Sequence, residues 1–361
     1  MKIAVLCHMH HPISEPFEGG TEAHTAMIAN GLIARGHSVT LFAKEGSQTD
    51  AELYPLVPKD FEFVHRASPL VRKQQKGFLA EAVFHSIDVI RQSNFDVVVN
   101  NSLSSLPYTF MRDLRMMTVL HTPPTLEDVS SVVSHPDWEP AEHHSYVTVS
   151  HTNAASWRAL LPSTRVILNG VDLSMWNVDA PPRSDTVVWA ARITPEKGLH
   201  IAIDAARAAG MAIEFAGPIS HPAYFREQIE PRLGEMVRYV GHLSHTELPN
   251  FIASGAVFVA SPLWAEPFGL SVVEAMATGT PVAALPNGAL PELVTATAGR
   301  VSRLVSARSL AAAIRSARTV ERDGVRLNAA RFSLNHMLDE YETELMDLAE
   351  SIPQVARDAA S

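Results

Sequence analysis

Residues Trp264–Val294 read WAEPFGLSVVEAMATGTPVAALPNGALPELV and follow an apolar, β-branched run that begins at Val257. That run has the length and composition of a fully buried strand. Two acids, Glu266 and Glu274, flank Gly269 in the turn that follows, and a helix is expected to begin there. Open α/β sheets bind their ligands where such strands end, and free amides at a helix start attract anions. Two carboxylates across this turn are suited to hold the hydroxyls of a ligand.

The composition of the whole chain is that of an ordinary globular enzyme. Its 361 residues are 46% hydrophobic and 19% charged, and this length predicts two domains. The formal net charge of −10 argues against non-specific nucleic-acid binding. The single cysteine, Cys7, excludes an intrachain disulfide and is interpreted as a small core residue. Because no signal segment and no apolar run of membrane-spanning length is recognised, we expect a cytoplasmic protein.

Strand and helix patterns alternate along the entire chain, which predicts an α/β fold with parallel sheets and right-handed crossovers. In the first half we expect strands at 2–7, 38–43, 95–100, 117–121, 146–150 and 165–168, and helices at 21–35, 78–92 and 106–114. In the second half we expect strands at 186–191, 212–216, 237–240, 257–261 and 281–285, and helices at 198–209, 223–233, 246–253, 291–294, 304–318 and 332–350.

This alternation predicts two Rossmann-like, doubly wound domains in series, facing each other across a cleft. The first domain is expected at residues 1–168 and the second at residues 169–331. Residues 169–185 contain consecutive prolines and little periodicity, so they are interpreted as the connection between the domains. A C-terminal helix at about 332–361 is expected to rejoin the first domain.

A cationic turn follows the first strand of the second domain. Arg192 stands at the end of that strand, and Lys197 follows five residues later. Thr194 is suited to cap a helix and Pro195 to begin it, which puts Lys197 in the first turn. The helix dipole disfavours a cation there by about 0.3–1 kcal/mol, unless an anion binds beside it. An arginine fork and a lysine point charge suit a diphosphate, whereas the alternative is two solvated surface cations.

Each of the two acids also has a structural explanation. Ser271-Val-Val-Glu274 has the spacing of a capping box, in which Glu274 would only satisfy a helix start. Glu266 alone would be an ordinary solvated loop acid. The position of the acids and the cations after strands of the same sheet favours one common ligand instead.

Taken together, these segments resemble the retaining glycosyltransferases of family 4, which have the GT-B fold. Residues 266–274 match the E-x7-E signature of that family, and the resemblance covers nearly the whole chain. The matching segments, besides Arg192 and Lys197-Gly198, are Gly19-Gly20, His121-Thr-Pro-Pro, Asn169-Gly-Val-Asp172, Ala216-Gly-Pro218, Val240-Gly-His242, 275–281 and 288–293.

The resemblance implies that the second domain binds a nucleotide diphosphate sugar and that a hexose passes to a hydroxyl acceptor. Arg192 and Lys197 would neutralise the diphosphate, Glu274 would hold the ribose, and Glu266 would hold sugar hydroxyls. His121 would lie beside the donor sugar as a further catalytic residue. Additional donor contacts are implied for Gly20, Gly217, Val240, Leu243, Phe268, Gly269, Leu270 and Ser271. UDP-sugars are expected first as donors and GDP-sugars second.

The family's retention of anomeric configuration implies departure and attack on one face of the sugar. The leaving phosphate would accept the acceptor's proton, and Glu266 as a covalent nucleophile is the alternative. The chain has no Asp-x-Asp, and Asp137-Trp-Glu139 is interpreted as a loop feature, so we expect turnover without metal or cofactor. Acceptor contacts or loop solvation are expected for His8, His10 and His11 rather than a metal site, and His24 faces either the cleft or the surface.

Other functions are alternatives to sugar transfer. A sugar-nucleotide 2-epimerase fits the same scaffold. A phosphorylase would need pyridoxal phosphate, and no lysine has a sequence context that suggests it. A non-catalytic sugar-nucleotide sensor is disfavoured because His121 and Glu266 are present. A Rossmann dehydrogenase is disfavoured because G-x-G-x-x-G is missing after the first strand. The acceptor stays open between a polysaccharide intermediate, a lipid-linked sugar and a small metabolite. No nucleic-acid partner is expected, and at most peripheral membrane contact.

Overall fold

The computed structural model describes residues 1–64, 68–179 and 184–351. The chain divides into two compact units. The first comprises Met1–Val149, Ala154–Ile167 and the chain from Leu338 onward, and the second comprises Ser150–Asn153 and Leu168–Met337. Residues 180–183 of the expected connection and residues 352–361 of the expected closing helix lie outside the described residues.

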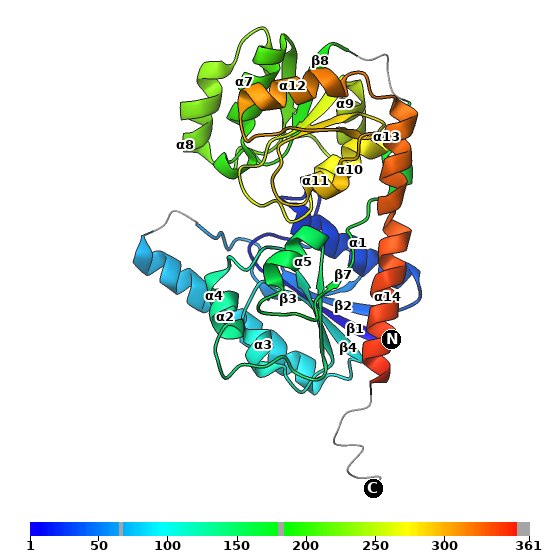
Figure 1. The fold of residues 1–361 in the computed structure, drawn as a ribbon. Coiled ribbons are helices and arrows are strands. Elements are labelled where there is room, and N and C mark those ends of the chain that lie inside the picture. Colours follow the sequence, from blue (N-terminus) through cyan, green and yellow to red (C-terminus); the bar gives the residue numbers. More distant parts are fainter. Residues whose placement is uncertain (65–67, 180–183, 352–361) are drawn as a thin grey trace. The chain divides into compact units, whose positions relative to one another are not determined.

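A parallel sheet forms the centre of the first unit (Figure 1). Over the described residues its strand order is β3-β2-β1-β4-β5-β6-β7, and the pairings are parallel. Because β1 lies between β2 and β4, the winding reverses there, which is the position where doubly wound sheets bind ligands. The strands are β1 (Lys2–Cys7), β2 (Ser38–Lys44), β3 (Glu52–Val57), β4 (Val97–Asn101), β5 (Met116–Leu120), β6 (His144–Thr148) and β7 (Arg165–Val166).

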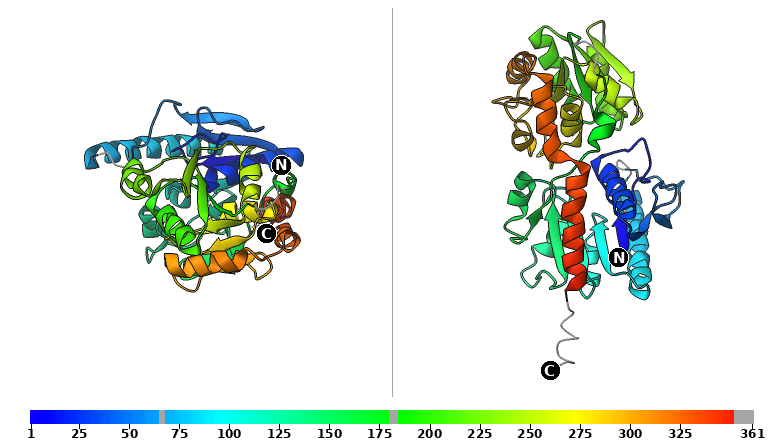
Figure 2. Two further views of the ribbon diagram at one scale, coloured as in Figure 1. Left: turned by 90° about the horizontal axis from the view of Figure 1, so that it is seen from above. Right: turned by 90° about the vertical axis from the view of Figure 1, so that its right-hand side faces the viewer.

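Helices surround this sheet. They are α1 (Gly20–Ala34), α2 (Pro69–Gln92), α3 (Leu106–Phe110), α4 (Glu127–Val133), α5 (His151–Trp157) and α14 (Leu334–Glu350). A core cluster joins α2 to one face of the sheet through residues such as Leu6, Phe42 and Ile87. On the first unit, α14 runs beside α1 (Figure 2), where Arg35 pairs with Asp339 and Glu342 at 2.7 Å each.

The second unit repeats the same strand order. Its described strands run β10-β9-β8-β11-β12-β13, all in parallel, so β8 and β11 flank the point where the winding reverses. The strands are β8 (Thr186–Ala190), β9 (Ala212–Ala216), β10 (Val237–Gly241), β11 (Val257–Ala260), β12 (Val282–Ala284) and β13 (Gly299–Val301).

Helices α7 (Leu199–Ala209) and α12 (Ala307–Ala317) lie side by side on one face of this sheet (Figure 1). Trp189, Phe215 and Ile314 belong to the core cluster between them and the strands. The remaining helical segments are α6 (Leu173–Trp176), η1 (Pro195–Lys197), α8 (Pro222–Tyr224), η2 (Phe225–Ile229), η3 (Glu230–Arg232), α9 (Leu248–Ser254), α10 (Leu270–Ala277), α11 (Leu290–Leu293), α13 (Arg322–Ala329) and η4 (Ala330–Phe332).

Most expected elements are present, and the differences have local causes. Helix α2 begins at Pro69, nine residues before the expected start, because the Ser68 side chain caps it and Pro69 takes a first-turn position. Strand β3 was not predicted, and it contains Pro55, which a sheet tolerates at its edge, where β3 lies. The expected helix at 223–233 is instead a short α-turn followed by the π segment η2 and the 3-10 segment η3.

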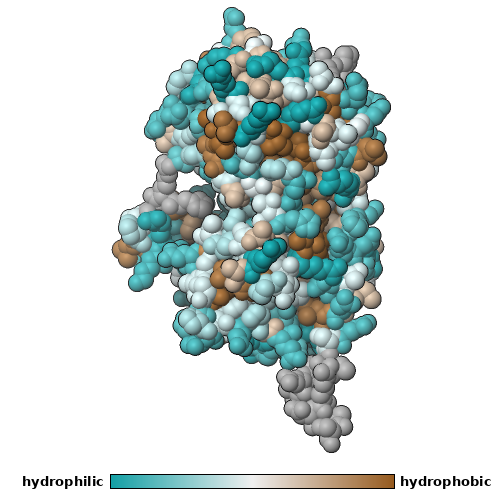
Figure 3. All heavy atoms as spheres, viewed as in Figure 1, coloured by the Kyte–Doolittle hydropathy of each residue, from teal (hydrophilic) through white to brown (hydrophobic). Residues whose placement is uncertain are grey.

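Polar residues dominate the surface drawn in Figure 3, and apolar residues form smaller groups among them. Exposed apolar side chains include Leu70 on α2, Leu304 before α12 and Leu327 on α13. Within the described residues, no helix combines the length and the apolar character that crossing a membrane requires.

Candidate functional site

The cationic and acidic turns of the second unit lie next to each other at the reversal point of its sheet. Strands β8 and β11 pair directly, with Val257 opposite Val187 and Phe258 opposite Val188. The turn with Arg192 and Lys197 follows β8, and the turn that leads to Glu266 follows β11. The register of two neighbouring parallel strands therefore brings the two turns to one edge of the sheet.

Backbone contacts hold the two turns together. Gly198 has a φ of +66°, and a Cβ there would lie 2.1 Å from the carbonyl oxygen of Ser261. The Ser261 hydroxyl donates to the Lys197 carbonyl at 3.1 Å, and the Leu263 amide donates to the Glu196 carbonyl at 2.7 Å. Only glycine satisfies both the left-handed backbone and this close approach, so Gly198 fixes where the Lys197 side chain begins.

Lys197 and Glu266 form an ion pair that the sequence did not reveal. Lys197 Nζ lies 2.7 Å from Glu266 Oε2, and the two side chains are 20% and 12% exposed. Trp264 Nε1 donates to the same carboxylate oxygen at 2.9 Å, and Lys197 Nζ lies 5.4 Å from the Trp264 ring centroid. Both charged groups are thus held in one orientation at the edge of the sheet, and Trp264 is a site residue that spacing alone did not indicate.

Arg192 lies in the same turn as Lys197 and has no partner among the described residues. Among the described residues, its half-buried guanidinium makes no hydrogen bond or ion pair. Thr194 caps the 3-10 turn η1 through its backbone position, as expected, and Pro195 begins that turn. The Thr194 hydroxyl is buried and has no hydrogen-bond partner in the described part of the chain. The guanidinium is therefore available to an incoming anion, whereas the Thr194 hydroxyl is sealed from solvent.

The capping-box interpretation of Glu274 is wrong. Helix α10 begins at Leu270 with Gly269 as its N-cap, and no side chain caps it. Ser271 and Glu274 are consequently second and fifth in the helix, two residues too far along to form a capping box. The half-buried Glu274 carboxylate makes no hydrogen bond to any described residue, and burial raises its pKa to about 7.

The raised pKa of Glu274 makes the stability of the protein depend on pH. The ordinary pKa is 4.5, so the folded state binds more protons than the unfolded state between about pH 4.5 and 7. The stability cost of this group is absent below pH 4.5, grows as pH rises, and is complete above pH 7. We expect Glu274→Gln to raise the melting temperature at pH 8 and to leave it unchanged at pH 4.5.

This pH dependence can be checked by thermal melts of the two proteins across pH 4.5–8. Glu292→Gln is not a suitable control because its carboxylate accepts hydrogen bonds from His151 and Thr152. Glu235→Gln, an exposed residue of the same unit, should leave the melting temperature unchanged at every pH. An equal effect of Glu274→Gln at pH 4.5 and pH 8 would contradict a burial penalty at Glu274.

The backbone around the acidic turn is positioned by two glycines. Gly269 has a φ of +104°, and Gly288 has a φ of +61°. A Cβ on Gly288 would lie 2.1 Å from the Glu266 carbonyl oxygen, to which the Ala289 amide donates at 2.8 Å. The Phe268 side chain is buried against Phe332, while Leu270 and Ser271 are half-buried.

The other predicted donor contacts lie on adjacent strand ends. Gly217 has a φ of +139°, and a Cβ there would lie 1.9 Å from the Ala191 carbonyl oxygen, directly before Arg192. The Gly217 amide donates to the Gly241 carbonyl at 2.9 Å, which connects it to the half-exposed segment with Val240 and Leu243. Gly217 follows β9, Val240 lies near the end of β10 and Leu243 follows β10, so these residues continue along one edge of the sheet.

The first unit carries a polar cluster at its own reversal point. His8, which follows β1, has its Nε2 3.3 Å from Glu22 Oε1, and both side chains are buried. Burial opposes ionisation of Glu22, but the hydrogen bond and charge of His8 outweigh it and lower its pKa to about 2. His8 is therefore not solvated in its loop, as one of its two expected roles required, because it is paired inside the protein. Gly20 is exposed and begins α1, whose start has no side-chain cap.

His24 and His121 lie together beside this pair. Their ring centroids are 4.6 Å apart, and His24 Nε2 lies 3.1 Å from the Tyr341 hydroxyl of α14. His24 is fully buried, so the expectation that it faces either a cleft or the surface is wrong. Burial lowers its pKa to about 3. His10 packs on Phe63, and burial lowers the pKa of the half-buried His11.

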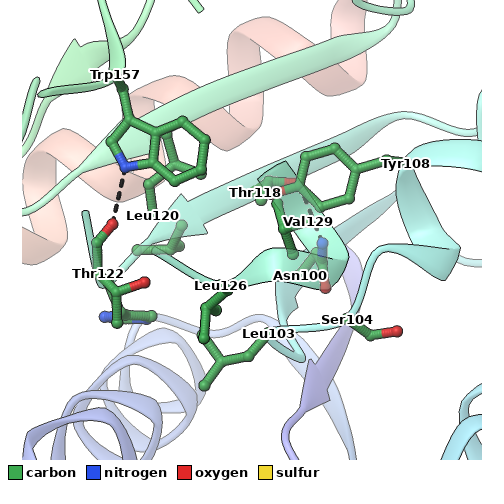
Figure 4. Close-up of a pocket in the computed structure, with 12 residues that line it drawn as sticks. Asn100, Leu103, Ser104, Tyr108, Thr118, Leu120, Thr122, Leu126, Val129 and Trp157 are labelled. Atoms are coloured by element: carbon green, nitrogen blue, oxygen red, sulfur yellow. Dashed lines mark hydrogen bonds between the residues drawn. The ribbon is translucent and has the colours of Figure 1, made fainter. Parts of the chain in front are cut away.

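A small pocket opens beside His121 on the first unit (Figure 4). Leu120, Leu126 and Val129 form apolar walls, and Trp157 is held by a 2.8 Å hydrogen bond from its Nε1 to the Thr122 carbonyl. Its polar lining comes from Asn100, Ser104, Thr118 and Thr122. Leu103, also in the lining, is a non-glycine residue with positive φ, 57°, a conformation typical of functional loops. In the described ranges, no group of three His, Cys, Asp or Glu side chains is arranged to hold a metal.

Family comparisons agree with this architecture. The family described as "Glycosyltransferase Family 4" matches residues 18–175, and "Glycosyl transferases group 1" matches residues 172–330. The computed structure superimposes on the Anabaena HepE protein in complex with UDP-glucose with a TM-score of 0.72. That match has 20% identity and covers 96% of this chain and 100% of the other. The fold is therefore GT-B, and the chain belongs to the family 4 glycosyltransferases.

Two curated relatives illustrate the range of this family. A glycogen synthase of Mycobacterium tuberculosis is 35% identical over 145 residues, which are 37% of this chain and 34% of that protein. The matched part thus spans about a third of the length of the glycogen synthase. A D-inositol 3-phosphate glycosyltransferase of Mycolicibacterium smegmatis is 25% identical over 337 residues, covering 81% of this chain and 77% of that protein.

Proposed function

We propose that this protein is a retaining glycosyltransferase that moves a hexose from a nucleotide diphosphate sugar to a hydroxyl acceptor. The observation that carries this proposal is the contact of Lys197 with Glu266, in a turn that also holds Arg192, which has no partner among the described residues. Two cations and a carboxylate at the edge of a doubly wound sheet match the phosphates and hydroxyls of such a donor. Family membership supports the same reaction.

In this proposal the donor is held by groups of opposite character. Arg192 and Lys197 contact the diphosphate, and Glu266 accepts hydrogen bonds from sugar hydroxyls near the reacting carbon. Glu274 accepts from the ribose hydroxyls, which suits a carboxylate that has no partner in the described protein. Backbone groups of Phe268, Gly269, Leu270 and Ser271 approach the sugar or phosphates. Gly217, Val240 and Leu243 contact the remainder of the nucleotide.

The proposed chemical step needs charge stabilisation more than a protein base. The bond between the anomeric carbon and the phosphate oxygen breaks, and its electron pair stays on the phosphate. Arg192 and Lys197 neutralise that charge, which is the kind of term that contributes most to many enzymatic reactions. The acceptor oxygen bonds to the same face of the sugar, and its proton passes to the leaving phosphate. Because two side-chain cations supply the positive charge, we propose turnover without a metal.

The roles of Gly20 and His121 are also proposals. Gly20 would offer its backbone amide to the diphosphate, and His121 would contact the donor sugar. The acceptor is assigned to the first unit, whose pocket beside His121 combines apolar walls with hydroxyl and amide groups.

A donor screen tests the proposed function. UDP-glucose is the first candidate because the structurally similar Anabaena protein forms a complex with it. A ligand at 100 times its dissociation constant stabilises a protein by about 2.7 kcal/mol, so thermal melts with UDP-, GDP- and ADP-sugars should reveal one donor class. Arg192→Ala should abolish the shift. Absence of a shift with every sugar nucleotide would contradict the proposal.

Product analysis separates transfer from the second candidate, a sugar-nucleotide epimerase. An epimerase converts the donor without an acceptor, whereas the proposed enzyme releases the nucleotide diphosphate only as sugar is transferred or hydrolysed. Retention is checked by the anomeric configuration of the product. Activity in the presence of EDTA tests the proposed independence from metal.

A further inference from the structure

A chain of hydrogen bonds leads from His121 into the first unit. His121 Nε2 lies 3.2 Å from Asn101 Oδ1, at the end of β4. Asn101 Nδ2 donates to the Thr25 hydroxyl at 3.2 Å, and that hydroxyl donates to the Thr21 carbonyl at 2.8 Å. His121, Asn101 and Thr25 are all buried.

The direction of this chain is set at its far end. A carbonyl only accepts hydrogen bonds, so the single hydroxyl hydrogen of Thr25 points to the Thr21 carbonyl. The Thr25 oxygen is then free to accept from Asn101, which turns the amide nitrogen of Asn101 toward Thr25. Its Oδ1 therefore faces His121. Because this oxygen also only accepts, the ring proton of a neutral His121 must lie on Nε2.

The surroundings of His121 keep the ring neutral. Burial, the neighbouring His24 and the paired His8 all lower the pKa of His121. The Glu22 carboxylate raises it by less, so the pKa stays well below its ordinary value. With its one proton on Nε2, the ring has a lone pair on Nδ1. The Nδ1 atoms of His8 and His24 are buried and have no partner among the described residues. The Nδ1 atom of His121 is not one of these buried atoms. His121 lines the pocket of Figure 4.

We propose that Asn101 is a positioning residue that holds His121 in the Nε2–H tautomer, so that Nδ1 accepts a hydrogen bond from a sugar hydroxyl. His121 then orients the sugar and transfers no proton to the leaving phosphate. This inference rests on the proposed function for the identity of the ligand. The tautomer itself is a property of the unliganded protein.

The first test is independent of activity. Long-range proton–nitrogen NMR of the 15N-labelled protein reports the tautomer of each histidine, and the spectrum of His121→Gln identifies the signals of His121. We expect the neutral Nε2–H form from pH 5 to pH 8. A ring protonated on Nδ1, or one that titrates near pH 6.5, would overturn the proposal even if no variant folds.

Asn101→Asp tests the consequence for catalysis. The carboxylate still accepts from Nε2, but its charge raises the pKa of His121 and favours the doubly protonated ring. Nδ1 then carries a proton and no longer accepts, so kcat at pH 7 should fall by about tenfold, the value of one hydrogen bond, and recover at higher pH. The KM for the donor should change less than kcat. A pH profile identical to that of the wild type would overturn the proposal.

Asn94→Asp is the control, because it introduces the same change of charge at an exposed position of the same unit, shortly before β4. It should retain the wild-type shape of the pH profile. Thr25→Val is a second variant that frees the Asn101 amide to turn, and it should lower kcat without the recovery at high pH. If no sugar nucleotide supports transfer while the NMR result holds, the proposed function fails and the tautomer assignment stands.

Discussion

Replacing Lys197 with methionine is expected to lower kcat for sugar transfer by about 10²- to 10³-fold, the usual cost of removing one preorganised charge-stabilising group. Methionine keeps the length of the side chain and removes its charge. The Glu266 carboxylate keeps its hydrogen bond from Trp264 but loses its only ion-pair partner among the described residues. We therefore also expect the free energy of unfolding to fall by about 1–3 kcal/mol.

Steady-state kinetics with the donor identified by the screen measure the first effect, and chemical denaturation measures the second. Lys73→Met, on the exposed start of α2, is the matched control and should change neither quantity. The reciprocal variant Glu266→Gln should retain the fold and lose transfer activity to a similar degree. Turnover near the wild-type value in a folded Lys197→Met protein would remove Lys197 from the proposed site.

Replacing Gly288 with alanine is expected to lower the free energy of unfolding by about 3 kcal/mol or more and to abolish transfer. The added Cβ would lie 2.1 Å from the carbonyl oxygen and 2.2 Å from the amide nitrogen of Glu266. Backbone atoms cannot move aside as the end of a flexible side chain can. The turn that carries Glu266 must therefore shift, and its carboxylate loses its position beside Lys197.

Gly210→Ala separates this clash from the cost of a left-handed backbone. Gly210 lies in the same unit with a φ of +76°, but a Cβ there would meet no atom within 4 Å. It should cost only about 1 kcal/mol and leave kcat unchanged. Equal losses of stability in the two variants, measured by chemical denaturation, would show that the approach to Glu266 is not what constrains Gly288.

Local sequence patterns predicted much of the fold because each strand is a short apolar run followed by a turn signal. The strand at 212–216 has the expected bounds, and α7 begins one residue later than expected. The patterns missed β3, whose Pro55 is acceptable only because the strand lies at the sheet edge. An edge position is a property of the whole sheet, and no local window contains it.

In the candidate site too, local features could be predicted from the sequence and long-range contacts could not. The turn that carries Arg192 and Lys197 was recognisable because its capping residues and charges are close in sequence. The contact between Lys197 and Glu266 spans 69 residues and depends on the register of β8 with β11. Glu274 was ambiguous because Ser271 has capping-box spacing, and only the observed start of α10 at Leu270 excludes that role. Asn101 gave no signal, since its importance arises from Thr25 on another element.

The repeated strand order has a practical consequence for engineering. In each unit, the groups assigned to sugar transfer lie at the carboxyl ends of the strands, in the loops there and in the helices that follow them. Gly36 and Gly210 occupy equivalent loops at the opposite ends. Gly36 lies between α1 and β2, and Gly210 lies between α7 and β9. A Cβ at either position would meet no described atom within 4 Å. Such loops are where inserted sequence is best tolerated. They offer one attachment point per unit for a fluorescent label or affinity tag, remote from the groups assigned to sugar transfer.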